Sequence, residues 1–261
     1  MESFDPKPAL NDHAGKTIAE SPFKSVLDSP YLKKNLREFV AGNHKVFPTI
    51  YPLQVGYKKY GAAGIEISDW WSNLAGCVDD LAIVRSMTTK EGEHQRASYM
   101  LHTSYLPTAS VNYPTLGSVV SREIRDRDLE LPAFVRIGRA PNGGNGGLLG
   151  TEFDAFSMTS ASRLPDNTTL PTDKDRYQRR RGLLNKMEAA AGPTLSREQI
   201  DENQKIYDQA AKMILSPNMQ AFDVSRESDK VRDAYGRSEF ATGCLLARRL
   251  VEQGVTFVEV A

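Results

Sequence analysis

Helical spacing of apolar residues alternates with short apolar runs along this chain. A short helix precedes the apolar run at residues 81–84, and a helix over 115–125 precedes the run at 131–137. A third helix, over 239–253, precedes the terminal run. Short apolar runs bounded by turn residues are typical of buried strands. The alternation therefore predicts an α/β fold with a mainly parallel sheet flanked by helices on both faces.

Two of the predicted helices carry an apolar stripe. Between 115 and 125 the stripe consists of Leu116, Val119, Val120 and Ile124. Between 239 and 253 it consists of Phe240, Cys244, Ala247 and Val251. Because an apolar stripe normally faces the core, we expect these side chains to be buried. Gly254 should end the second helix before the strand at 255–260.

Capping residues mark two further helices. Ser196 and Gln199 form a capping-box pattern, which predicts a long helix that Pro217 stops. Ser225 is the predicted cap of the next helix, and Gly236 is its predicted end. Ser68 should cap the short helix before residues 81–84.

Two segments contain turn residues rather than a sustained apolar period. Residues 1–60 are loop-dominated, with a helical candidate at 31–40 and extended segments near 46–55. Residues 138–193 are predicted to be a loop-rich insertion or cap. The glycine-rich run inside this insertion favours a mobile loop, because no Lys-Ser/Thr pair follows it as in a phosphate loop. The triplet Arg179, Arg180 and Arg181 favours a solvated helix face.

Composition excludes some functions. The 261 residues are 40% hydrophobic, enough for a large core, and 33 basic residues balance 33 acidic ones. We therefore expect no nucleic-acid partner. No apolar run approaches the about 20 residues that span a bilayer, and no export signal precedes residue 20. Cys77 and Cys244 are expected to be two buried small hydrophobic residues.

Candidate chemistry is concentrated after the apolar run at 81–84. Thr88, Thr89 and His94 lie in one polar segment that also contains Lys90 and Glu91. At the carboxyl edge of a parallel sheet such a segment could supply a nucleophilic hydroxyl, a cation for an oxyanion, and a metal ligand or acid. That combination suits ester hydrolysis. The alternative is an ordinary strand-to-helix loop in which one of the threonines only caps the helix.

Six segments together resemble one bacterial family. They are MESFDPKP (1–8), VRSMTT (84–89), MLHT (100–103), YPTLGS (113–118), LPAFV (131–135) and LARRLVEQGV (246–255). In this order and spacing they are similar to the sulfatase-like domain-of-unknown-function 1501 family. The resemblance implies an alkaline-phosphatase-like α/β fold and a hydrolase for phosphate or sulfate esters that uses a divalent metal ion: zinc, calcium or magnesium. It also implies a periplasmic or secreted location for the complete protein.

The resemblance extends to single residues at the start of the chain. Glu2 occupies the position expected of an acidic metal ligand, and Thr88 or Thr89 occupies a position suited to the nucleophile. No Cys-x-Pro-x-Arg sulfatase signature occurs, since Val78 follows Cys77. The family's leading strand and its later motifs are missing, so we expect residues 1–261 to be a partial, incomplete domain. Such a domain should hold no metal tightly.

Three hypotheses follow for the function. The first is an N-terminal portion of a metal-dependent phosphate or sulfate ester hydrolase, which we expect to be inactive as this fragment. The second is a non-catalytic extracytoplasmic protein that binds sulfated or phosphorylated polymers. The third is a small partner-binding module. Open sheet edges would allow association with a partner, because unpaired strands recruit partners. They argue against the third hypothesis, which requires the terminal strand to be paired.

Overall fold

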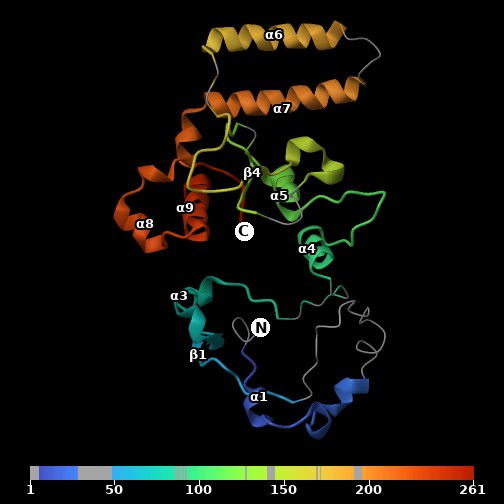
Figure 1. Cartoon of the computed structure of the whole chain (residues 1–261), viewed down its shortest axis with the longest axis vertical. Helices are drawn as coiled ribbons and strands as arrows, with labels where there is room; N and C mark the ends of the chain where they lie inside the picture. Colours follow the sequence, from blue (N-terminus) through green and yellow to red (C-terminus); the bar gives the residue numbers. More distant parts are fainter. Residues whose placement is uncertain are drawn as a thin grey trace. The chain divides into compact units, whose positions relative to one another are not determined.

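A parallel sheet of three strands lies in the second half of the computed structural model (Figure 1). Its strands are β3 (Phe134–Ile137), β4 (Phe156–Met158) and β5 (Phe257–Val260), in the order β4-β3-β5. The chain divides into two units, Met1–His94 and Gln95–Ala261, and the sheet belongs to the second. The structure describes residues 6–28, 49–85, 87, 89, 91, 93–126, 128–139, 145–168, 170, 172–190 and 196–261.

Helices cover the two faces of this sheet. Gly117 of α5 (Leu116–Ile124) lies against the ring of Phe134, and Gly243 of α9 (Glu239–Glu252) lies against Ile137. Phe134 and Ile137 are three positions apart on β3, so their side chains point to opposite faces. The predicted α/β architecture with a parallel sheet flanked by helices is therefore confirmed.

The main core lies between the sheet and α9. It includes Val135 and Ile137 of β3 together with Leu245, Leu246 and Leu250 of α9, all buried. The predicted helix is confirmed, but the predicted stripe is wrong: Phe240 and Val251 are exposed, and Cys244 and Ala247 are only partly buried. The core side of α9 is displaced by about one residue from that stripe. The physical reason is that Gly243 lets the helix approach Val260 closely.

The apolar stripe of α5 also points away from the sheet. Leu116, Val119 and Ile124 are exposed, whereas Gly117, Ser118 and Ser121 are buried. A Cβ atom on Gly117 would lie 2.5 Å from the Phe134 ring, so the ring requires a glycine there. Close approach of helix and sheet selects the small residues for the inner face. The predicted helix is thus confirmed and its predicted inner face is wrong.

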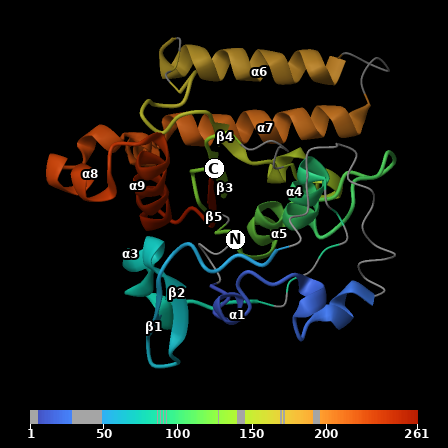
Figure 2. The same cartoon turned by 60° about the horizontal axis from the view of Figure 1, so that its bottom comes forward.

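Two long helices run antiparallel beside each other in both views (Figures 1 and 2). They are α6 (Lys174–Ala190) and α7 (Arg197–Leu215). α7 begins with the predicted capping box, in which the Ser196 hydroxyl accepts a hydrogen bond from the Gln199 amide, and it ends before Pro217. The predicted boundaries of this helix are confirmed.

The next helix, α8 (Asp229–Tyr235), begins later than predicted. Its cap is Ser228, whose hydroxyl accepts a hydrogen bond from the Val231 amide, and Gly236 ends it as predicted. Ser225 is therefore not the cap. Its hydroxyl donates to Asp223, whose carboxylate caps a preceding 3-10 turn.

The segment predicted to be a loop-rich insertion contains regular structure. Both β4 and α6 lie within residues 138–193, and β4 pairs with β3. β4 has only three residues, too few for a recognisable alternation. The part of the glycine-rich run at 141–144 lies outside the described residues.

The first unit contains an antiparallel hairpin that sequence periodicity did not predict. β1 (Tyr57–Tyr60) pairs with β2 (Ile65–Ser68). As predicted, Ser68 caps the turn that leads into α3 (Ser72–Ala75), and Gly76 ends this helix. A small core of Ile67, Ala75 and Val78 holds these elements together.

Two other predictions for the first unit are wrong, and one falls outside the described residues. Residues 81–84 form no strand: no strand in the described part of the chain pairs with them, and all four are exposed. Cys77 is exposed instead of buried. The helical candidate at 31–40 lies outside the described residues, as do residues 46–48, and α1 (Ala9–Asp12) is the helix described before them.

Candidate functional site

The residues that sequence reasoning proposed for catalysis are not brought together in the described part of the chain. Glu2 and Thr88 lie outside the described residues. Thr89 is exposed, and its hydroxyl accepts a hydrogen bond of 3.1 Å from the amide of Glu91. His94 is the exposed first residue of α4 (His94–Thr103). Their proposed roles remain predictions, although the strand expected before them does not form.

A charged pair lies instead inside the parallel sheet. Arg136 of β3 and Glu259 of β5 are register partners on adjacent strands. The guanidinium of Arg136 donates two hydrogen bonds to Glu259 Oε2, from Nη2 at 2.9 Å and from Nε at 3.2 Å. Arg136 is only 3% exposed. A buried charge of this kind requires a hydrogen-bonded partner, so the two residues depend on each other.

The second oxygen of the same carboxylate contacts a histidine. His102 Nε2 lies 3.2 Å from Glu259 Oε1, and His102 Nδ1 lies 2.7 Å from the backbone carbonyl oxygen of Ser98. Both partners are acceptors, so a ring protonated at both nitrogens would donate to each of them. We call Arg136, His102 and Glu259 the Arg-Glu-His cluster, and its net charge is +1 when His102 is protonated.

The cluster occupies a favourable place on the sheet. Arg136 and Glu259 are each the next-to-last residue of their strand. Ligands of parallel α/β sheets bind at the carboxyl ends of the strands. The side chain of His102 is 34% exposed, whereas that of Arg136 is buried. An approaching anion would therefore meet the ring of His102 first, with the guanidinium of Arg136 behind it.

Sequence reasoning missed this cluster, although a signal was present. Arg136 and Glu259 are single charged residues inside the two apolar runs that form β3 and β5. A charged residue is seldom buried unless it is paired, so two such residues on strands predicted to be buried could have been matched. His102 lies in the MLHT segment, but nothing in the sequence places it near residue 259.

A second candidate is a cavity of about 320 Å³ beside the start of α9. Phe222, Leu245 and Val224 contribute apolar lining, and Arg163 and Arg237 contribute charge. Arg237 is occupied by Asp229 at 3.0 Å and Asp233 at 2.6 Å. The hydrogen bonds and charges of these two aspartates raise the pKa of the Arg237 guanidinium, with the Asp233 hydrogen bond the largest cause. Because two aspartates already pair with the Arg237 guanidinium, we consider this cavity a weaker anion site than the Arg-Glu-His cluster.

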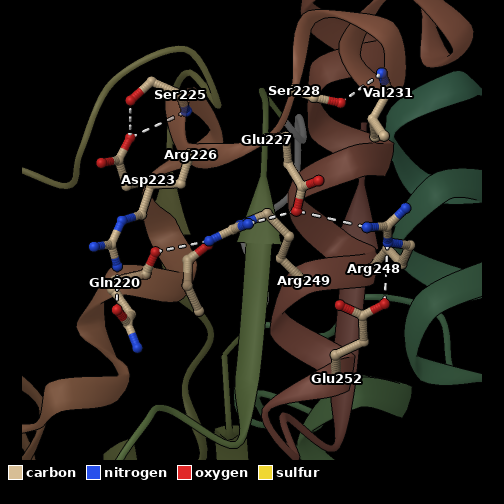
Figure 3. Close-up of polar contacts among 11 residues, drawn as sticks. Gln220, Asp223, Ser225, Arg226, Glu227, Ser228, Val231, Arg248, Arg249 and Glu252 are labelled. Carbon is tan, nitrogen blue, oxygen red and sulfur yellow. Dashed lines mark hydrogen bonds and ion pairs between the residues drawn. The ribbon is translucent and has the colours of Figure 1, made fainter.

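A third polar cluster has a structural role (Figure 3). Arg249 donates to the backbone carbonyls of Ala221 and Gln220, both at 2.9 Å, and to Glu227 at 2.5 Å. Arg248 contacts both Glu227 and Glu252. The carbonyls of the 3-10 helix Pro217–Phe222 therefore receive side-chain donors from α9. This network joins two elements and leaves little hydrogen-bonding capacity for a ligand.

The described residues contain no group of three or more His, Cys, Asp or Glu side chains placed to hold a metal ion. Glu2, the metal ligand implied by resemblance, lies outside them. Glu259 already contacts Arg136 through Oε2 and His102 through Oε1, so three of its about four lone-pair sites are engaged. The Arg-Glu-His cluster therefore fits an anion better than a metal.

Glu239 at the start of α9 leads to a pH prediction. The hydroxyls of Ser162 and Ser160 donate to its carboxylate at 2.8 and 3.0 Å and lower its pKa, the Ser162 bond being the larger cause. A lowered folded-state pKa stabilises the fold above the unfolded-state value, and this contribution is lost as the pH falls through the folded-state pKa. We expect Ser160→Ala/Ser162→Ala to melt below the parent at neutral pH and to converge with it on acidification below about pH 4.

Thermal melting between pH 3 and 7 measures this effect. Ser157→Ala, which removes an exposed hydroxyl bonded to a backbone carbonyl, serves as the control. A difference between the double variant and the parent that does not shrink on acidification would contradict the assignment to Glu239.

Comparison with known proteins gives one positive result. No curated protein and no solved structure matches the chain. A family model described as a protein of unknown function, DUF1501, matches residues 1–261. The match covers the whole of the sequence, including the three segments that supply Arg136, His102 and Glu259. The chain therefore belongs to the DUF1501 family.

Proposed function

We propose that this chain recognises the anionic group of a phosphate or sulfate ester and takes part in the hydrolysis of that ester. The observation that supports the proposal is the Arg-Glu-His cluster near the carboxyl ends of β3 and β5. Its net positive charge lies partly out of water, where charge acts more strongly than at an exposed surface. Phosphate and sulfate esters have oxygens that such a charge attracts.

Each member of the cluster has a different task in this proposal. The partly exposed ring of His102, in its protonated form, faces the oxyanion of the ester. Glu259 orients the ring through Nε2, and Ser98 fixes the other nitrogen through its carbonyl oxygen. Arg136 holds the Glu259 carboxylate in place, and is therefore a positioning residue. The reaction itself adds water across the ester bond, releasing an alcohol and the inorganic acid.

A divalent metal remains part of the hydrolase hypothesis through resemblance alone, and a threonine nucleophile remains part of it through its position after residues 81–84. A bound metal would polarise the ester and lower the pKa of the attacking hydroxyl. Glu2 is the proposed ligand, Thr88 or Thr89 the proposed nucleophile and His94 the proposed acid. Because the described residues do not assemble a site for this metal, the tasks of the Arg-Glu-His cluster do not depend on it.

One observation favours the alternative of binding without turnover. Within the described residues, no hydroxyl or thiol forms a hydrogen bond to the side chains of the Arg-Glu-His cluster. A cluster that attracts an anion without a hydroxyl bonded to it among the described residues suits a protein that binds a sulfated or phosphorylated polymer. The two functions share the same charge and differ only in whether the ester is cleaved.

Anion binding and turnover should be measured separately. We expect inorganic phosphate or sulfate to bind, and His102→Gln to weaken that binding about tenfold or more, because a charge-assisted contact is lost. Calorimetric titration measures the binding, and release of 4-nitrophenol from its phosphate and sulfate esters measures turnover. Arg122→Gln, an exposed cation of α5, is the control.

The outcomes separate the hypotheses. Loss of both binding and turnover in His102→Gln would support the hydrolase, and loss of binding in a protein without turnover would support the polymer-binding alternative. Activity that is lost in Thr89→Ala and His94→Gln but unchanged in His102→Gln would move the site to the segment predicted from sequence. A parent protein that binds neither anion would overturn the proposal.

A further inference from the structure

One face of α6 has cations and large apolar side chains without partners. At about 100° per residue, six residues fall within one arc of about 120°. They are Arg176, Arg179, Arg180, Leu183, Lys186 and Met187, which we call the outer face of α6. All six are exposed, and no ion pair to any of the four cations occurs within the described residues.

The opposite side of α6, its inner face, packs against α7. The outer face is therefore left exposed. Tyr177, Arg181, Leu184 and Glu188 are half-buried on the side of α7. Arg181 pairs with Asp208 of α7 at 2.6 Å and lies over the Tyr207 ring at 4.9 Å, and Glu188 accepts a hydrogen bond from Gln204 at 3.3 Å. These contacts hold α6 along α7. The two helices lie side by side in both views (Figures 1 and 2).

The outer face differs from an ordinary solvated helix face in its apolar residues. Leu183 is 59% exposed and Met187 is 62% exposed. They are one turn apart, so their side chains adjoin each other. Arg176, Arg179 and Arg180 precede Leu183, and Lys186 lies between Leu183 and Met187. The cations therefore extend over about 15 Å of the helix, from residue 176 to residue 186. A partner that contacts this face meets positive charge and an apolar ridge together.

Charge decides between the possible partners. α6 contains six cations and two carboxylates, a net charge of +4, so the outer faces of two copies would repel each other. A nucleic acid or a sulfated polymer would use the cations and leave Leu183 and Met187 unexplained. No aromatic side chain lies on the outer face for stacking with bases. An anionic lipid surface uses both features, because its headgroups attract cations and its acyl boundary takes up apolar side chains.

We propose that the outer face of α6 binds the surface of an anionic lipid bilayer, with the helix lying in the plane of the interface. Leu183 and Met187 enter the headgroup boundary, and Arg176, Arg179, Arg180 and Lys186 contact lipid phosphates. The attachment is peripheral: none of the described helices is long and apolar enough to cross a membrane. Membrane binding by α6 is independent of the ester chemistry of the Arg-Glu-His cluster.

Sedimentation with lipid vesicles tests this proposal. We expect the chain to bind vesicles of phosphatidylglycerol and phosphatidylcholine, to bind pure phosphatidylcholine much less, and to dissociate as salt is raised. Arg179→Glu/Arg180→Glu should weaken binding at least tenfold, since each cation near an anionic surface contributes about 1 kcal/mol. Leu183→Ser/Met187→Ser should weaken it by a similar factor while leaving the charge unchanged.

A matched control changes the same charge elsewhere. Arg122→Glu/Lys212→Glu alters two exposed cations of α5 and α7 and should bind vesicles nearly as the parent does. Circular dichroism confirms that each variant remains helical. Equal loss in the control and in Arg179→Glu/Arg180→Glu would show that net charge alone matters and would overturn the assignment to the outer face.

Binding to soluble polyanions and to zwitterionic vesicles provides further tests of the proposal. Binding of dextran sulfate or duplex DNA that exceeds vesicle binding and is unchanged in Leu183→Ser/Met187→Ser would replace the lipid surface with a soluble polyanion. Equal binding to anionic and zwitterionic vesicles would contradict the role of the cations. A parent chain that binds none of these vesicles would overturn the proposal outright.

Discussion

Arg136→Ala is expected to lower the free energy of unfolding by about 3–5 kcal/mol. The substitution leaves Glu259 charged in the sheet without the guanidinium that donates two hydrogen bonds to it. Arg136 is the more buried member of the pair, so water cannot easily replace it. Urea denaturation followed by circular dichroism measures the loss, with light scattering to detect aggregation.

Replacement of both members tests whether the cost comes from an unpaired charge. Arg136→Met/Glu259→Leu removes both charges and keeps apolar volume in the sheet, so it should be far more stable than Arg136→Ala. It also deprives His102 of its carboxylate partner. If the double variant were as unstable as the single one, packing of the long arginine side chain would explain the loss. Anion binding should weaken in the folded double variant, because the His102 ring loses the carboxylate that orients it.

Leu246→Ala is expected to cost about 2–5 kcal/mol. Leu246 is 0% exposed and belongs to the core between α9 and the sheet. Truncation removes buried apolar surface and leaves a cavity that surrounding side chains fill only in part. The same urea titration measures the effect.

Val251→Ala on the same helix provides the matched comparison. Val251 is 57% exposed, and its truncation should change the free energy of unfolding by no more than about 0.5 kcal/mol. Sequence periodicity placed Val251, and not Leu246, on the inner stripe. A larger loss in Val251→Ala than in Leu246→Ala would restore the face predicted from the sequence.

Several helix boundaries could be predicted from the sequence, because the interactions that fix them are local. The Ser196 hydroxyl and the Gln199 side chain satisfy amides within the same turn, and Pro217 cannot continue a helix. Gly236 and Gly254 adopt positive φ angles at helix ends. Such effects involve neighbours along the chain, so the residue types alone identify them.

Which face of a helix is buried could not be predicted from the local sequence, because it depends on contacts with distant parts of the chain. α5 and α9 each have an apolar stripe, but close approach to Phe134 and to Val260 buries the glycine side instead. Residues 81–84 are apolar enough for a strand, but no strand among the described residues pairs with them. Conversely, the three-residue strand β4 forms because β3 pairs with it.

The Arg-Glu-His cluster also has features that the sequence predicts and features that only packing produces. The apolar runs alone identify Arg136 and Glu259 as charged residues inside predicted strands. That these residues meet each other and His102 follows from the tertiary structure, because 157 positions separate His102 from Glu259 and 123 separate Arg136 from Glu259. Parallel pairing of β3 and β5 aligns the two charges, and burial forces them to neutralise each other. Contacts over such separations arise from packing and not from local propensity.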